Sequence, residues 1–256
     1  MCSSDLSGSE PDAAGAQESP PQTAIHLRPT APLAERVLMP GDPGRALALA
    51  QTLLQEPRMF NHHRGLWGYT GVASDGEPLT VQATGMGGPS AAIVLWELIA
   101  LGARRAIRVG TCGALDLTLA LGDVIIAREA ICLDGTSRAL FGAAQVAADD
   151  ALTEALMRNA PGARTGAIAS VDLFYDDGPA SQLDAARSRG DPVPLAVEME
   201  AAALFALGAR AEVAVACVLA VSDTFDAQGV RARIDDHALR RAAERMGAAA
   251  VAALSA

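Results

Sequence analysis

The sequence contains no lysine, and all twenty of its basic residues are arginine. The absence of lysine excludes a lysine-dependent phosphate loop, a Schiff-base enzyme and a pyridoxal linkage, because each of these needs a lysine amine. An anion site in this chain therefore has to be built from arginine guanidinium groups and backbone amides.

Cysteine is scarce, and its spacing indicates neither disulfides nor zinc. The four cysteines are far apart and form no CxxC pair: Cys2, Cys112, Cys132 and Cys217. His62 and His63 are adjacent, so their side chains would point in different directions on a regular element. We expect reduced thiols, no metal and no organic cofactor.

Long hydrophobic runs and an excess of positive charge are also missing. The apolar stretch 91–102 is interrupted at Glu97, too early for a helix that spans a bilayer. A net charge of -10 and a pI near 4.8 disfavour nucleic-acid binding, which needs a basic face. We expect no membrane and no nucleic-acid partner, and a small substrate instead.

Residues 1–24 differ in composition from the rest of the chain. They are rich in Ser, Gly, Pro and Ala, contain acidic but no basic residues, and show no apolar periodicity. This pattern predicts a disordered acidic tail, and it lacks the basic start and apolar stretch of a signal peptide. We expect a cytoplasmic protein with one folded domain over 25–256.

The folded part alternates strand-like and helix-like segments. Apolar β-rich runs occur at 37–40, 79–84, 106–110, 123–127 and 214–221, and helical patterns occur at 46–54, 89–102 and from about Asp235. The alternation predicts an α/β fold, a single three-layer domain with a central mixed β-sheet flanked by helices. Ligands of such sheets bind beyond the carboxyl ends of the strands, so the residues there are the candidates.

Gly41 to Arg45 directly follow the first predicted strand. Asp42 and Pro43 suit the start of a helix and have a purely structural explanation. Arg45 fits that explanation less well, because a cation in the first helical turn opposes the helix dipole. A nearby anion would explain its position, and both interpretations remain open.

Two glycine-containing segments follow later strands. Thr84 to Ser90 form a glycine-rich turn before a helix, which is either a tight turn or a place where backbone amides approach a ligand. Arg108 lies inside an apolar strand and must be paired, exposed or directed at a ligand. Together with Thr111 it favours a phosphate pocket over a structural ion pair.

Carboxylates follow two further strands. Glu198 and Glu200 precede a helix, whose dipole they could complement, but they also share one face of an extended segment and could bind a sugar diol. Ser222 and Asp223 follow a very apolar strand. Asp223 is either a helix cap or a general acid whose pKa is raised by desolvation.

Taken in order, these segments resemble the nucleoside phosphorylase family of bacterial purine nucleoside phosphorylases, uridine phosphorylases and methylthioadenosine-handling enzymes. The resemblance covers about Ile25 to the C-terminus. The segments that carry it are VLMPGDPGRA, NHHRGLWGYTG, TGMGGPSAAIVLWELIALGARRAIRVGTCGAL, SVDLFYDDG, VEMEAAALFALGA and AVSDTFD.

The resemblance implies a role for each candidate residue. It implies a phosphate site from Gly41, Arg45, Arg108 and Thr111, with Arg64 from a neighbouring subunit, and a nucleoside site from His26 of the neighbour, Phe174, Glu198, Met199, Glu200 and Ser222. Asp223 would protonate the leaving base with the support of an arginine, either Arg231 or Arg233. Phosphate is a co-substrate, and the enzyme would be a homo-oligomer, a hexamer or trimer of dimers, with active sites shared across a dimer interface.

The family contains several activities, of which a purine nucleoside phosphorylase fits best. Uridine phosphorylases read uracil with a Gln and an Arg beyond the DLFY-like segment, and residues 176–180 offer neither. The turn 84–90 and residues 133–137 are more similar to uridine phosphorylases, so uridine remains the alternative base. A methylthioadenosine phosphorylase or nucleosidase and a nucleoside-binding protein without activity are further alternatives.

Overall fold

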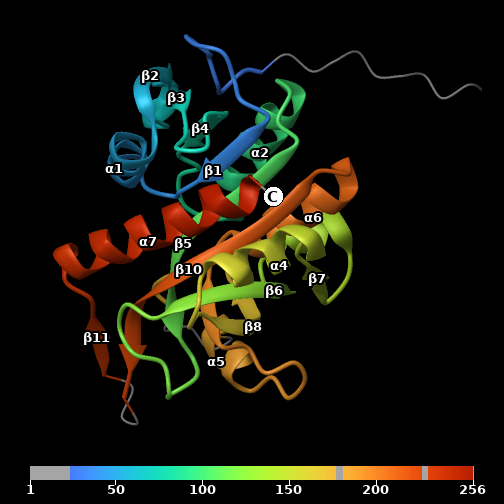
Figure 1. Ribbon diagram of the computed structural model, residues 1–256. Coiled ribbons are helices and arrows are strands. Elements are labelled where there is room, and N and C mark those ends of the chain that lie inside the picture. Colours follow the sequence, from blue (N-terminus) through green and yellow to red (C-terminus); the bar gives the residue numbers. More distant parts are fainter. Residues whose placement is uncertain (1–23, 177–180, 227–229, 256) are drawn as a thin grey trace, which may run out of the picture.

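The strands of the chain pair into one mixed sheet, shown in Figure 1. The computed structural model describes residues 24–176, 181–226 and 230–255. The strands of these residues are β1 (Arg36–Met39), β2 (Gln55–Asn61), β3 (Gly68–Val72), β4 (Pro78–Gln82), β5 (Arg105–Ala114), β6 (Val124–Cys132), β7 (Gln145–Ala147), β8 (Arg164–Ser170), β9 (Ala196–Glu198), β10 (Ala214–Phe225) and β11 (Arg231–Arg233). The five predicted strands correspond to β1, β4, β5, β6 and β10.

The helices of the described residues lie on both faces of the sheet. They are α1 (Pro43–Leu53), α2 (Gly88–Ala100), α3 (Gly135–Phe141), α4 (Asp150–Asn159), α5 (Gln182–Arg187), α6 (Ala201–Ala211) and α7 (Asp236–Leu254), with a 3-10 turn η1 (His63–Gly65). The predicted closing helix is α7, which begins where the Asp235 carboxylate accepts a hydrogen bond from the Ala238 amide.

Pairing around β5 closes part of the sheet into a ring. β5 pairs with β1 and β10 in parallel and with β9 in antiparallel orientation. β10 continues to β6, β6 to β8, and β8 to β9, which leads back to β5. β5 and β10 are therefore central strands, and side chains near their carboxyl ends are enclosed by several neighbouring elements.

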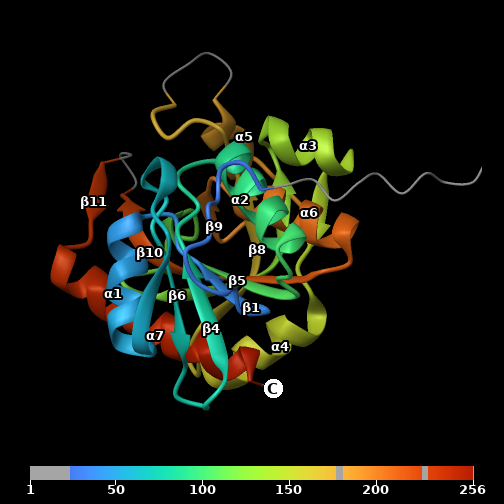
Figure 2. The same ribbon diagram turned by 90° about the horizontal axis from the view of Figure 1, so that it is seen from above.

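Alternate residues of the central strands form two hydrophobic cores, one on each face of the sheet. On β10, Val215 and Cys217 pack into the core with α2 and α6, whereas Ala216 and Val218 pack into the core with α1, α4 and α7. Figures 1 and 2 show the two groups of helices on opposite faces of the sheet. The predicted three-layer α/β domain with a mixed sheet is confirmed.

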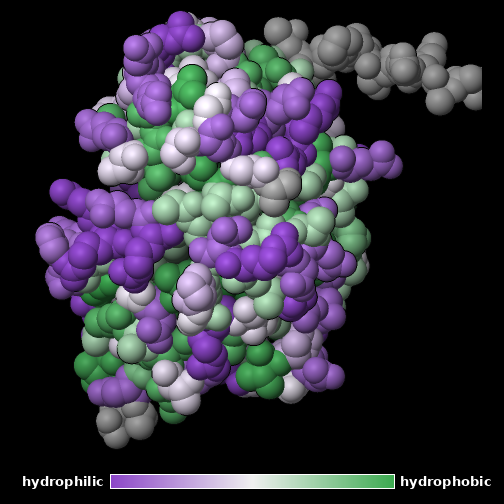
Figure 3. Space-filling model, in the orientation of Figure 1, coloured by the Kyte–Doolittle hydropathy of each residue, from purple (hydrophilic) through white to green (hydrophobic). Residues whose placement is uncertain are grey.

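The surface of α7 is divided along its length. Its first half exposes Asp236, His237, Arg240, Arg241 and Glu244, and Figure 3 shows hydrophilic side chains gathered over this half. No helix within the described ranges is both long enough and apolar enough to cross a membrane.

Three of the four cysteines lie within the described residues. Cys112, Cys132 and Cys217 are free thiols in the interior. Cys2 and nearly all of the predicted disordered tail lie outside the described residues.

Candidate active site

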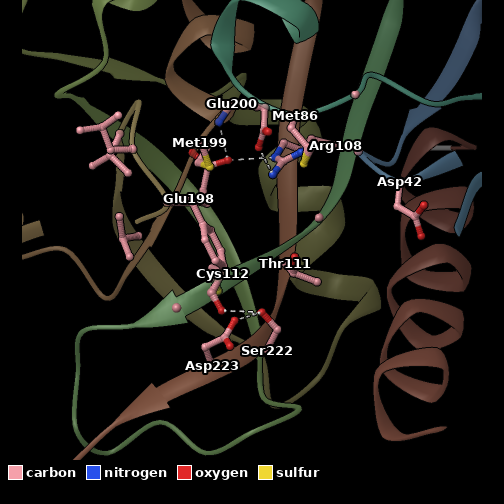
Figure 4. A pocket seen from close by; sticks show the side chains of 18 of the residues that line it. Asp42, Met86, Arg108, Thr111, Cys112, Glu198, Met199, Glu200, Ser222 and Asp223 are labelled. Atoms are coloured by element: carbon pink, nitrogen blue, oxygen red, sulfur yellow. Dashed lines mark hydrogen bonds and ion pairs between the residues drawn. The ribbon is translucent and has the colours of Figure 1, made fainter. Parts of the chain in front are cut away.

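A cavity of about 640 Å³ opens at the carboxyl ends of several strands, where the fold predicts a ligand site. Its wall comes from the residues that follow β1 and β4, the second half of β5, the segment after β8, β9 with the start of α6, and the end of β10. Figure 4 shows Arg108 with Glu198 and Glu200 at one end of the cavity, and Ser222 with Asp223 at the other. Thr111 and Cys112 lie between the two ends.

The loop between β1 and α1 supports both interpretations of its sequence. The Asp42 carboxylate accepts hydrogen bonds from the amides of Gly44 and Arg45, so Asp42 is the helix cap. Arg45 lines the cavity, and its guanidinium makes no hydrogen bond among the described residues. Burial lowers the pKa of Arg45, with a partial offset from the charge of Asp42. A desolvated cation without a hydrogen-bonded partner is favourable only beside an anion.

Arg108 is a buried cation held by two carboxylates. Its Nε donates to Glu198 at 3.0 Å, and its Nη2 pairs with Glu200 at 2.5 Å. The guanidinium lies over Gly110, where a Cβ would approach it to 2.8 Å. Burial alone would lower the pKa of Arg108, but the charges of Glu200 and Glu198 outweigh burial and raise it.

One nitrogen of Arg108 remains available. Within the described residues, Nη1 is buried and has no hydrogen-bond partner. A guanidinium nitrogen in this state requires an acceptor. Arg108 is therefore part of a structural ion pair and also keeps one buried donor, while its contact with a ligand stays a prediction.

Glu198 and Glu200 have different partners despite their position two residues apart. The Glu198 carboxylate accepts from the amides of Glu200 and Ala201 and from the Ser170 hydroxyl, so it holds the start of α6. Glu200 points away from its own helix and accepts from the Gly87 amide. Helix-start chemistry explains Glu198, and it does not explain Glu200.

Asp223 lies within a strand, so the helix-cap interpretation is wrong. It belongs to β10, and the pairing of β10 with β5 shifts between Val221 and Asp223. This bulge turns the Asp223 side chain toward the cavity. The Ser222 hydroxyl has a single hydrogen to donate, and its oxygen lies 2.7 Å from Asp223 Oδ2 and 3.2 Å from the Cys112 carbonyl oxygen.

The expectation that desolvation raises the pKa of Asp223 is wrong for the unliganded site. Burial does act in that direction, but hydrogen bonds from Arg231 and Ser222 and the charges of Arg231 and Arg233 outweigh it. The pKa of Asp223 is therefore held below its ordinary value. Asp223 is an ionised carboxylate in the free protein at neutral pH, because β11 brings two arginines to it.

The two candidate arginines differ in their contacts. Arg231 Nε lies 2.8 Å from Asp223 Oδ1 and lines the cavity, whereas Arg233 Nη1 lies at 3.3 Å and its side chain is 62% exposed. Arg231 also stacks over the Phe174 ring, 4.4 Å from its centroid. Phe174 lines the cavity as predicted, and Arg231 connects this aromatic side chain to Asp223.

Comparison with known proteins agrees with this geometry. The sequence profile of the phosphorylase superfamily matches residues 35–255. The chain belongs to this superfamily. Proteins named purine nucleoside phosphorylase DeoD-type from Bacillus thuringiensis (strain Al Hakam), Bacillus mycoides (strain KBAB4) and Bacillus cereus (strain B4264) are each 40% identical to it over 199 residues. Each match covers 75% of this chain and 82% of the relative.

The structure of this phosphorylase superfamily member brings most predicted site residues to one cavity. The wall contains Gly41, Arg45, Arg64, Arg108, Thr111, Phe174, Glu198, Met199, Glu200, Ser222 and Asp223. Arg64 thus lies at the cavity of its own chain, on η1, where it adopts φ +59°. A contribution of Arg64 to a neighbouring subunit remains a prediction.

His26 is the exception among the nucleoside-site residues, because the wall of the cavity in its own chain does not include it. Its Nδ1 lies 2.7 Å from the Glu97 carboxylate, which also accepts from the amides of Ile25, His26 and Leu27. The predicted contact of His26 with a neighbour's nucleoside is untested.

Several residues of the site were not predicted from the sequence. Met86, Cys112 and Phe225 line the cavity, although each lies within a segment that carried the resemblance. The Gly87 amide contacts Glu200 across 113 residues of sequence, and Glu97 holds the chain around His26. The glycine-rich turn was a weak signal for the first contact, and the interruption of an apolar run by Glu97 was a signal for the second.

Proposed function

We propose that this chain is a purine nucleoside phosphorylase, which uses inorganic phosphate to convert a purine nucleoside into free base and ribose 1-phosphate. The observation that carries the proposal is the buried and unpartnered Nη1 of Arg108, beside the desolvated guanidinium of Arg45. These two cations form one end of the cavity and suit a phosphate dianion. The backbone of Gly41 and the hydroxyl of Thr111 also line this end of the cavity.

The proton donor belongs at the other end of the cavity. Asp223 pairs with Gly113 on β5, five residues beyond Arg108. At roughly 3.3 Å per residue, this separates the two positions by about 16 Å along the strand. Since both side chains reach into the cavity, a sugar and a base fit between the phosphate end and Asp223.

The reaction needs an anion at one end of the cavity and a proton donor at the other. As the bond between C1′ and the base nitrogen lengthens, its electron pair moves to the base and positive charge develops on the sugar. Phosphate stabilises that charge and then forms the new bond from its oxygen to C1′, held in position by the arginines. Asp223 protonates the leaving base. Because Asp223 is ionised in the free protein, the bound base must raise its pKa so that Asp223 takes up a proton from solvent, which it then transfers to the base.

Other residues hold the nucleoside. Glu200 and Met199 suit the sugar hydroxyls, with Glu198 fixing the start of α6, and the Phe174 ring offers a face for the base. Ser222 orients Asp223 through its hydrogen bond. The chemistry uses phosphate as co-substrate and requires no metal or organic cofactor.

A purine fits this site better than uracil. Gln182, the first residue of α5, is the glutamine nearest to the Phe174 segment that could recognise uracil. Its side-chain amide is already engaged in hydrogen bonds within the protein. It accepts from the amides of Asp172 and Leu173 and donates to the Leu133 carbonyl. Because these bonds hold the loop that carries Phe174, Gln182 supports the loop and is not free to recognise a base.

The test is release of free base from inosine, adenosine, methylthioadenosine and uridine, each with and without phosphate. We expect release from the purine nucleosides, dependent on phosphate. Release without phosphate would identify a nucleosidase instead, and fastest release from uridine would identify a uridine phosphorylase. No release from any substrate would favour a nucleoside-binding protein.

We also infer a cytoplasmic homo-oligomer, a hexamer or trimer of dimers, that acts in nucleotide salvage and shares its active sites between subunits. Support comes from apolar side chains around the segment that carries His26. Ile25 is 67% exposed, and Ile93 and Trp96 on α2 are 42% and 40% exposed. Apolar groups gathered on one surface are typical of a subunit contact.

A further inference from the structure

Gly87 and Glu200 form a buried contact that the proposed reaction does not yet explain. The Gly87 amide donates to Glu200 Oε1 at 2.5 Å, and Glu200 is only 6% exposed. The other carboxylate oxygen, Oε2, pairs with Arg108. Each oxygen of Glu200 is thus fixed by one donor from the protein. Figure 4 shows Glu200 beside Arg108 and Met86.

Only glycine can present its amide in this way. Gly87 adopts φ +85° and ψ 158°, a region of backbone conformation that is essentially restricted to glycine. A Cβ at this position would meet nothing closer than Pro89 Cδ at 3.9 Å. Space is therefore not the reason for glycine here, and the backbone angles are.

The loop around Gly87 is fixed at its other end. The Gly85 amide donates to the Gly41 carbonyl, which ties the loop to the residues at the phosphate end. The Ser90 hydroxyl donates to the Thr84 carbonyl at 2.6 Å and crosses the base of the loop. These bonds leave the Gly87 amide little freedom of direction.

This loop is poorly suited to an anion, which was one interpretation of its glycines. Pro89 has no amide hydrogen, so one of the donors at the start of α2 is missing. The Gly87 amide is engaged by Glu200. The glycine conformation at Gly87 therefore serves the tight turn and the contact with the Glu200 carboxylate.

We propose that Gly87 is a positioning residue for sugar binding: its amide fixes the Glu200 carboxylate so that the remaining lone pairs of both oxygens accept the sugar hydroxyls. The inference rests on the proposed function, because it takes Glu200 as the sugar contact. A carboxylate has about four acceptor sites, and two of them are used by Gly87 and Arg108. The free sites keep a fixed direction, which reduces the entropy lost when a nucleoside binds.

The test compares binding of inosine and hypoxanthine by calorimetry without phosphate, in wild type, Gly87→Ala, Glu200→Gln and the double variant. The two ligands share the base, and only inosine has the sugar. Gly102→Ala is the matched control, since Gly102 lies beyond the other end of α2 with φ +116° and open space at its Cβ. Thermal melting of each variant shows whether it is folded.

We expect Gly87→Ala to weaken inosine binding by about tenfold or more while hypoxanthine binding is unchanged. The double variant should bind inosine as weakly as Glu200→Gln, because both changes act on one contact. Gly102→Ala should lose stability only. Unchanged inosine affinity in folded Gly87→Ala, or an equal loss for both ligands, would overturn the positioning role. A wild type that binds neither ligand would overturn the proposed function and this inference together.

Discussion

Arg45 and Arg108 share the proposed phosphate end, but their removal would leave different residues behind. Arg45→Ala removes a cation whose guanidinium makes no hydrogen bond to the described residues, so the fold should persist. We expect the KM for phosphate to rise by roughly tenfold or more, the value of a charge-assisted hydrogen bond. An unchanged phosphate KM in steady-state assays would refute the role of Arg45.

Arg108→Ala is a poorer probe of phosphate binding. It would leave the Glu198 and Glu200 carboxylates buried without their cation. Breaking such a pair destabilises a protein by about 3–5 kcal/mol. Loss of activity in this variant would therefore reflect stability as well as phosphate binding.

Arg231 controls the charge state of Asp223. Its hydrogen bond and charge lower the pKa of Asp223, so Arg231→Gln should raise it. In the complex with inosine the protonated acid then persists to higher pH, so the basic limb of the kcat profile should move to higher pH. Arg233→Gln should give a smaller shift, because Arg233 is farther away and exposed. A limb that stays in place in Arg231→Gln would contradict this role.

Asp223→Asn is the reference for that measurement. An amide cannot donate the same proton, so turnover should fall by roughly 10²–10⁴ and the basic limb should disappear. A variant that melts early but turns over normally would show that Asp223 is structural.

Among the helices, α2 carries Glu97, which anchors residues 25–27 at the start of the folded domain. Its carboxylate accepts from the amides of Ile25, His26 and Leu27. Burial would raise the pKa of Glu97, but these hydrogen bonds and one from the His26 ring outweigh burial and lower it. The stabilisation is thus complete above the unfolded pKa near 4.3 and is lost as pH falls through the lower folded value.

Glu97→Gln tests this anchor. We expect the variant to lose about 1–3 kcal/mol of unfolding free energy at pH 7, because its neutral amide is a weaker acceptor for these donors. The difference from wild type should shrink as pH falls below about 4, when the wild-type carboxylate also becomes neutral. Denaturant unfolding at several pH values measures it, and a difference that is independent of pH would contradict the charge-based explanation.

The elements that sequence predicted are those with a strong apolar signal. β5 and β10 are buried on both faces and read as continuous apolar runs. β11 was missed because its three exposed residues Arg231–Arg233 carry no such pattern, and pairing with β10 determines its conformation. The pKa of Asp223 was wrongly expected to be raised for the same reason, because the arginines that lower it lie on β11.

The candidate site shows the same limit. The residues that follow strands were predictable, because a sheet collects the carboxyl ends of its parallel strands. Their partners were not, since the contact between Gly87 and Glu200 and the bulge at Ser222 depend on tertiary packing. Local sequence offers only a weak signal, the glycine-rich turn, for a donor that lies 113 residues away.

At the scale of the whole molecule, the shared active site makes a prediction about mixed subunits. His26 does not line the cavity of its own chain, whereas Asp223 does. If His26 serves a neighbour, a dimer of one His26→Ala and one Asp223→Asn chain has one intact site and one site with both defects. Random reassembly should therefore restore about a quarter of wild-type activity, because half of the pairs are mixed.

The measurement is the activity of the two variants after denaturation and reassembly together, with subunit exchange shown by differently tagged chains. Exchange without gain over the mean of the parents would mean that each chain builds its own site. The same mixture with Arg64→Ala in place of His26→Ala tests the corresponding expectation for Arg64.

In the proposed reaction, phosphate itself attacks the sugar. The most direct measurement is phosphorus NMR of the protein with inosine and phosphate, with hypoxanthine release followed in parallel. We expect a sugar 1-phosphate signal that grows in step with hypoxanthine. Hypoxanthine release accompanied by free ribose, with no sugar phosphate formed, would contradict it.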